Sequence, residues 1–306
     1  MASIRLRESN AGGFRESDRR RRNNLVAGPT PLTIANETAG TIIARMARKQ
    51  GVRSYDFSTY PSPDSVLGQQ YYYVTLRFWP SLVFVTPFLV VYEIGRLVNQ
   101  AGPTSPNEQL VAAWLIESLV RTIGVSGYFP APTLLTVAVL LACHLVAKHP
   151  WKFDIWVLAG MLGESLIYTI PLIVLRRIPH AAVLATGSAS YDTWLNEVIR
   201  SFGGGVYEEL VFRFICMNVL HIFLVDLCRL PRTPASVAII FASAVVFAAS
   251  HHWPLGSEQF NQTEFLFRTF AGLYLAGLYF FRGFGVAAGC HSFYNVLVYT
   301  LVALRG

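Results

Sequence analysis

Charged residues are scarce in this chain. They make up 14% of its 306 residues, whereas an average soluble domain has about 25%. Hydrophobic residues make up 53%, and the mean hydropathy is +0.42. This shortage of charge argues against a soluble globular domain and indicates a membrane protein.

The chain also lacks the closely spaced cysteines of a zinc or redox motif. Its four cysteines are dispersed through apolar stretches, at Cys143, Cys216, Cys228 and Cys290. We expect all four to be buried, reduced packing residues. A disulfide between two membrane spans is the alternative.

No secretory signal peptide is apparent, because the first apolar stretch of any length begins only near Val74. Basic charge is concentrated before it. Residues 1–53 hold 11 Lys and Arg against 4 acids, an excess equal to the formal net charge of +7. Because basic segments are held on the cytoplasmic side, residues 1–73 are predicted to form a basic, partly disordered cytoplasmic tail. Binding of anionic lipid or nucleic acid is the alternative, and we expect no nucleic-acid partner.

Most of the remaining chain consists of apolar stretches long enough to cross a bilayer, which takes about 20 residues. The candidate spans are 76–98, 131–147, 155–175, 205–228, 234–252, 265–281 and 284–304, with 109–124 as a weaker eighth. Glu117 and Arg121 of the eighth are four residues apart and could pair. Since lipid cannot satisfy backbone polar groups, the spans must be helical. We predict an all-α, polytopic transmembrane bundle of about eight spans, with early spans in 74–190 and a separate core in 191–306.

Ionisable residues inside spans are unfavourable and usually mark function, and three late segments carry them. The first is a glycine break, Gly203–Gly205, that runs into Glu208 and Glu209. On a helix, Glu209 and Arg213 stack on one face and Glu208 points about 100° away. Glu209 is therefore predicted to form a structural ion pair. Glu208 is left without a cationic neighbour and is the candidate general base.

The other two segments carry histidines. Phe247 and His251 share a face at the end of an apolar helix, and His291 and Asn295 share a face inside the last span. Taken alone, a histidine at a helix end is an interfacial residue, which is how we interpret His252, and the last pair could simply hydrogen-bond two helices together. In combination, a carboxylate, two imidazoles and a carboxamide supply the base and the oxyanion donors of a water-activating hydrolase.

At these residues the sequence resembles the CPBP family, the CAAX protease and bacteriocin-processing membrane proteins that include the Ras-converting CAAX prenyl endopeptidases. The family pattern is E-E-x-x-x-R, F-x-x-x-H and H-x-x-x-N or D on successive segments. Here it reads Glu208-Glu209-x-x-x-Arg213, Phe247-x-x-x-His251 and His291-x-x-x-Asn295. The resemblance covers about residues 195–304.

The resemblance implies an all-helical bundle with a conical intramembrane cavity that opens toward the cytosol. It assigns water activation to Glu208 and His251, and oxyanion stabilisation to His291 and Asn295. Glu209, Arg213 and Phe247 would support them. The helix positions of these residues imply that they meet in a deep, water-filled cavity.

The family's members have been described both as metalloproteases and as metal-independent glutamate proteases. Glu208, His251 and His291 could ligate zinc and leave a position open for water. The helical H-E-x-x-H zinc motif is absent, which favours a site without a tightly bound metal.

We therefore expect an intramembrane endopeptidase that cleaves a membrane-associated or lipid-modified peptide or protein. The expected location is the bacterial cell (inner) membrane. A non-proteolytic scaffold or immunity-type protein of the same fold is one alternative, and a proton- or metal-coupled transporter is another. Glu93 and Glu164 are further intramembrane acids to which the sequence assigns no role.

Overall fold

The computed structural model describes residues 67–98, 111–122, 124, 130–152, 154–177, 191–253, 256 and 258–304. Most of the predicted basic tail, residues 1–66, lies outside the described residues. Every described helix belongs to one compact unit of the chain.

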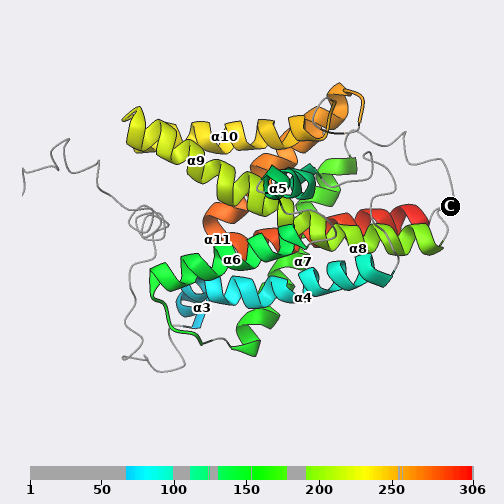
Figure 1. Cartoon of the computed structure of the whole chain (residues 1–306), viewed down its shortest axis with the longest axis horizontal. Coiled ribbons are helices and arrows are strands. Elements are labelled where there is room, and N and C mark those ends of the chain that lie inside the picture. Colours follow the sequence, from blue (N-terminus) through cyan, green and yellow to red (C-terminus); the bar gives the residue numbers. More distant parts are fainter. Residues whose placement is uncertain are drawn as a thin grey trace, which may run out of the picture. The chain divides into compact units, whose positions relative to one another are not determined.

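Helices make up nearly all of the described part of this unit (Figure 1), as predicted for the all-α class. The described residues form no strand beyond an isolated bridge between His252 and Glu258. The elements are α3 (Leu67–Thr75), α4 (Phe78–Val98), α5 (Val111–Thr122), α6 (Ala131–Ala147), α7 (Ile155–Arg177), α8 (Tyr191–Glu208), the π-helical η3 (Glu209–Cys216), α9 (Met217–His221), the π-helical η4 (Ile222–Leu227), α10 (Arg232–Ser250) and α11 (Gln262–Ala303).

Five helices among the described residues are long and apolar enough to cross a membrane: Phe78–Val98, Ile155–Arg176, Trp194–Leu227, Arg232–Ser250 and Gln262–Ala303. Their outward faces carry large apolar side chains, such as Ile94, Ile167 and Phe280, which are more than half exposed. Such a surface suits lipid and not water. The chain is an integral, multi-pass membrane protein, while the predicted count of about eight spans is not confirmed.

Helix α11 is two helices joined at Gly283. This glycine has a φ of 83°, and a Cβ there would lie 3.2 Å from the Leu76 Cα. Gly272 and His291, on either side of it, both contact the η3 segment. A straight helix would separate them by roughly 28 Å, so the chain folds back at Gly283. The predicted spans 265–281 and 284–304 correspond to the two halves of α11.

The end of α8 and the start of η3 form a continuous helix that lies in the interior of the unit. It packs against α4 and α11, and α4 lies beside α6 (Figure 1). Val206, Tyr207 and Leu210 are fully buried there. The predicted glycine break at Gly203–Gly205 is wrong, because α8 runs without interruption from Tyr191 to Glu208.

The glycines lie where neighbouring helices come close to α8. A Cβ on Gly205 would lie 2.2 Å from the Ser292 hydroxyl and 2.5 Å from its backbone nitrogen. A Cβ on Gly203 would lie 2.4 Å from the Tyr92 ring. The glycines therefore allow α11 and α4 to approach α8 closely, as small residues do between membrane helices.

The acids of the early spans all have partners. Glu117 lies 3.9 Å from Arg121, as its spacing predicted, and 3.6 Å from Arg96. Glu93 accepts a hydrogen bond from Thr133, whose hydroxyl lies 2.6 Å from that of Tyr207. Glu164 of α7 binds a residue far away in the sequence, Arg282 of α11, at 2.6 Å.

All four cysteines are free thiols. Cys143 and Cys290 are buried, as expected. The prediction was wrong for Cys228, which is exposed, and Cys216 is only partly buried. Cys216 ends η3, and Cys228 follows η4, a segment that contributes no buried residue.

Candidate active site

Glu208 and Glu209 lie where the helix changes from α to π geometry. Glu208 is the last residue of α8, and Glu209 is the first of η3. Short π-helical segments are rare and frequently occur at functional sites. The sequence predicted an α-helix throughout residues 205–228, so the change to π geometry was not expected.

Glu209 is held in a fully buried ion pair. Its Oε1 lies 3.0 Å from Arg213 Nη1, and neither side chain is exposed. The guanidinium also stacks 4.2 Å from the centroid of the Phe247 ring. Removing both charges from water costs free energy. Their attraction offsets this cost only when the geometry is good and further contacts satisfy the remaining polar atoms. The predicted pair between these residues is thus present, and Phe247 completes it.

His291 joins the two acids. Its Nδ1 lies 2.8 Å from Glu209 Oε1, and its Nε2 lies 3.5 Å from Glu208 Oε2. His291 lies in the C-terminal half of α11. This half packs closely against α8 at Gly205, which brings His291 next to the two acids.

His251 approaches Glu208 from another helix. It caps the C-terminus of α10, and its Nε2 lies 3.9 Å from Glu208 Oε1. The Phe247 ring contacts both imidazoles, at centroid distances of 4.9 Å to His251 and 5.8 Å to His291. Glu208 is 7% exposed and therefore faces the interior and not lipid.

Each imidazole makes a hydrogen bond through its Nδ1 atom, and this bond turns its Nε2 atom toward Glu208. His251 Nδ1 lies 2.8 Å from the Phe247 carbonyl, which can only accept, so Nδ1 donates. His291 Nδ1 donates in the same way to the Glu209 carboxylate. In a neutral His251 ring, Nε2 then carries a lone pair directed at the Glu208 carboxylate. Two acceptors that face each other in this way require a proton donor between them, and a water molecule supplies two hydrogens.

Burial supports the neutral form of His251. It lowers the pKa of this histidine, and although the Glu208 charge opposes the effect, the net pKa lies below the ordinary value. Near pH 7 the ring is consequently neutral, with Nε2 available to accept a hydrogen bond.

Asn295 lies one helical turn beyond His291 and is partly buried. Among the described residues, no hydrogen bond joins it to the group around Glu208. The structure therefore brings six of the seven predicted residues together and places the seventh next to them in sequence.

His252 is not part of this group. It is 3% exposed, and its ring packs on Phe260 and Phe265. The chain after α10 turns back and covers this ring, while the interfacial location of His252 stays a prediction.

An ion pair that the sequence analysis missed holds this turn. Arg268 of α11 makes two hydrogen bonds of 2.7 Å to Glu258. The Glu258 backbone nitrogen in turn donates to the His251 carbonyl at 3.3 Å. No spacing rule links two residues across a loop, so only the folded chain reveals the contact.

The predicted zinc ligands, Glu208, His251 and His291, do not fit a metal centre in this arrangement. Across the described ranges, no group of three or more His, Cys, Asp or Glu side chains is positioned to hold a metal ion. The two Nδ1 hydrogen bonds nevertheless orient both Nε2 atoms toward Glu208.

Comparison with known proteins identifies the same part of the chain. Residues 190–297 match the family of type II CAAX prenyl endopeptidases described as Rce1-like. The match includes all three motifs and confirms the resemblance to CAAX proteases. No curated protein and no solved structure matches the chain. At the level of the family, this match supports a membrane-embedded peptidase domain in this segment.

Proposed function

We propose that this chain is an intramembrane endopeptidase that hydrolyses a peptide bond in a membrane-associated or lipid-modified substrate. The observation that carries the proposal is the position of Glu208. Its two carboxylate oxygens face the Nε2 atoms of His291 and His251, at 3.5 Å and 3.9 Å, inside a helical membrane protein.

In the proposed reaction, a water molecule is held between Glu208 and His251. It donates one hydrogen bond to the carboxylate and the other to His251 Nε2. Glu208 takes a proton as the water oxygen bonds to the substrate carbonyl carbon. Positioned general bases of this kind contribute roughly 10²–10⁴-fold to the rate.

His291 and Asn295 are proposed to stabilise the oxyanion. His291 Nε2 donates only when the ring is protonated, and Glu209 at Nδ1 balances that positive charge. The Asn295 amide makes no hydrogen bond within the described part of the chain, so it is free to donate. When the C–N bond breaks, the proton held by Glu208 passes to the leaving amine.

The location of the site indicates the substrate class. Glu208 and both histidines lie among apolar helices with lipid-facing surfaces. A peptide that carries a lipid, or that already lies at the membrane, reaches such a site without leaving the bilayer. We place the protein in the bacterial cell membrane, with its basic tail in the cytoplasm.

The two adjacent histidines offer a matched test. The purified protein in detergent is given prenylated and unmodified peptides, and the products are identified by mass spectrometry. His251→Gln should abolish cleavage of the lipidated peptide, because it removes the ring that faces Glu208. His252→Gln should retain cleavage, because that ring packs on Phe260 and Phe265 and does not face Glu208.

Folding of both variants is checked by thermal unfolding. If well-folded His251→Gln protein cleaves as fast as wild type, the proposed chemistry is wrong. If wild type cleaves neither peptide although it is folded, a scaffold function replaces the protease.

A further inference from the structure

A second cluster of polar residues lies away from Glu208, where α4 begins and α6 ends. Three rings meet there: Trp79 of α4, His144 of α6 and Trp151 of the following connection. The His144 centroid lies 5.8 Å from that of Trp79 and 4.3 Å from that of Trp151. The two indoles are 4.9 Å apart.

The connection between α6 and α7 is fixed at both ends. Lys148 adopts a left-handed conformation with φ 53°, and its backbone nitrogen donates to the His144 and Leu145 carbonyls. Asp154 accepts from the Trp156 backbone nitrogen at 2.9 Å and so caps the start of α7. This short connection returns His149 and Trp151 toward His144.

The cluster contains buried nitrogens that have no hydrogen-bond partner among the described residues. They are both ring nitrogens of His144, Nδ1 of His149 and Nε1 of Trp79. His144 is only 1% exposed. An indole nitrogen can only donate, and each imidazole carries at least one N–H. Buried polar groups are rarely left unpaired, so this group of donors lacks an acceptor.

The charge around the cluster is positive. Arg77 is 5% exposed and acts electrostatically on His149, and Lys148 and Lys152 are exposed on the connection. Burial, followed by the charges of Arg77 and His144, lowers the pKa of His149 to about 4. At neutral pH this ring thus offers a hydrogen bond, while the arginine and lysines supply the charge. The acceptor that fits is an anion.

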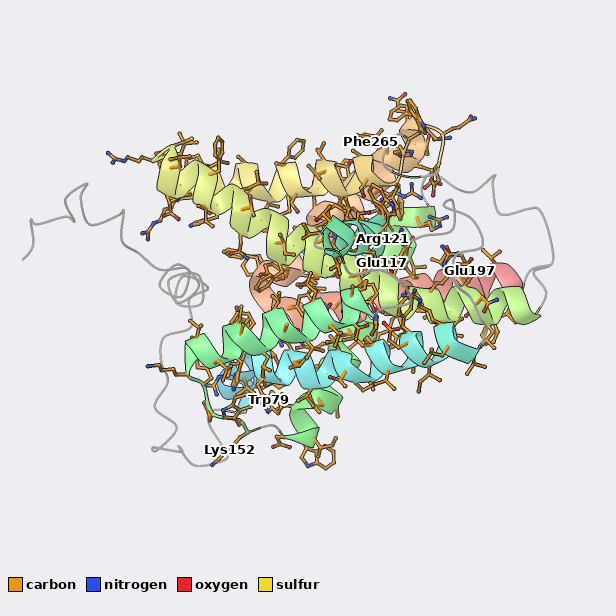
Figure 2. The ribbon with its side chains drawn as sticks, in the orientation of Figure 1. Trp79, Glu117, Arg121, Lys152, Glu197 and Phe265 are labelled. Atoms are coloured by element: carbon orange, nitrogen blue, oxygen red, sulfur yellow. The ribbon has the colours of Figure 1, made fainter. Side chains whose placement is uncertain are left out.

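The tryptophans place this cluster at the level of lipid headgroups. Trp151 is 52% exposed and Trp156 is 80% exposed, at the ends of helices that are apolar enough to cross a membrane. Tryptophan is enriched at the boundary between the headgroups and the hydrocarbon. Figure 2 shows Trp79 and Lys152 at the same end of the bundle.

We propose that the cluster of Trp79, His144, His149 and Trp151, with Lys148 and Lys152 at its rim, binds the phosphate of an anionic phospholipid. The buried nitrogens donate to the phosphate oxygens, and the exposed indoles contact the upper acyl chains. This site is separate from the protease chemistry, and its occupancy does not depend on cleavage.

The test measures lipid binding to the full-length protein by native mass spectrometry and by thermal unfolding in detergent. The added probes are phosphatidylglycerol, phosphatidylcholine and inorganic phosphate. Phosphatidylglycerol should bind most tightly and raise the unfolding temperature most. His144→Phe keeps the ring contacts but removes both nitrogens, and it should abolish the preference for phosphatidylglycerol. Lys152→Gln, at an exposed position that folding does not need, should weaken binding about fivefold.

Arg121→Gln is the matched control, because this exposed cation lies on α5 and outside the cluster. It should bind phosphatidylglycerol as wild type does. Equal binding of both lipids, or an equal loss in Arg121→Gln and Lys152→Gln, would overturn the proposal. Equal stabilisation by inorganic phosphate and by phosphatidylglycerol would also overturn it, because the site would then bind free phosphate and not a lipid.

Discussion

Replacing Arg213 by methionine tests the buried ion pair on which the geometry of the site depends. The change removes the guanidinium but keeps an apolar side chain of similar length against Phe247. Glu209 then loses the cation that lies 3.0 Å from its Oε1, while both positions stay fully buried. It keeps only the hydrogen bond from His291.

The expected loss is large because a carboxylate is left uncompensated in the interior. Breaking one partner of a buried ion pair typically costs about 3–5 kcal/mol. For a protein of this size, 1 kcal/mol corresponds to roughly 2–4 °C in the unfolding temperature, so Arg213→Met should lower it by on the order of 10 °C. The double variant Glu209→Gln with Arg213→Met removes both charges, and replacing an entire buried pair is often close to neutral.

Thermal unfolding of the purified variants in one detergent measures both effects. The double variant should recover most of the stability that the single variant loses, although its activity should stay low because His291 has lost a charged partner. If the double variant unfolds at the same temperature as Arg213→Met, the uncompensated charge is not the cause. The reasoning would then fail.

Two further predictions concern packing and pH. Gly205→Ala should destabilise the protein by about 1–3 kcal/mol, because the new methyl group meets Ser292 at 2.2 Å, whereas Gly163→Ala, with nothing within 4 Å, should not. Equal unfolding temperatures for the two variants would contradict this. Burial raises the pKa of Glu258, but hydrogen bonds and charge from Arg268 outweigh it, so the net pKa is lowered. A carboxylate with a lowered pKa stabilises the fold above its unfolded value, about 4.3, and this stabilisation is lost as pH falls through the folded value. Wild type should consequently lose more stability than Glu258→Gln below about pH 4.3, and parallel pH profiles would refute the assignment.

The site was predictable from sequence where local spacing determines contact. Glu209 and Arg213 are four residues apart and stay together even in a π-helix. The three polar segments also occur in separate apolar helices, which placed Glu208, His251 and His291 in one candidate group. Their convergence required only that membrane helices turn ionisable side chains inward.

The contacts that could not be predicted join residues far apart in the chain. Glu164 and Arg282 are 118 positions apart, and their pairing depends on the fold-back of α11 at Gly283. The hydropathy of the sequence likewise predicted the two apolar stretches 265–281 and 284–304. It did not predict the positive φ of Gly283, at which the two helices join. The π-helical segment after Glu208 was likewise not indicated by the spacing of apolar residues.

The central claim is that the Glu208 carboxylate activates water, and the initial rate of Glu208→Gln tests it most directly. The variant keeps the shape of the side chain and loses the base. Glu197→Gln, on the same helix (Figure 2), is the control. The account predicts that Glu208→Gln cleaves a lipidated peptide about 10²–10⁴-fold more slowly than wild type, at an unchanged unfolding temperature, while Glu197→Gln stays close to wild type. A rate for Glu208→Gln within a few-fold of wild type would contradict it.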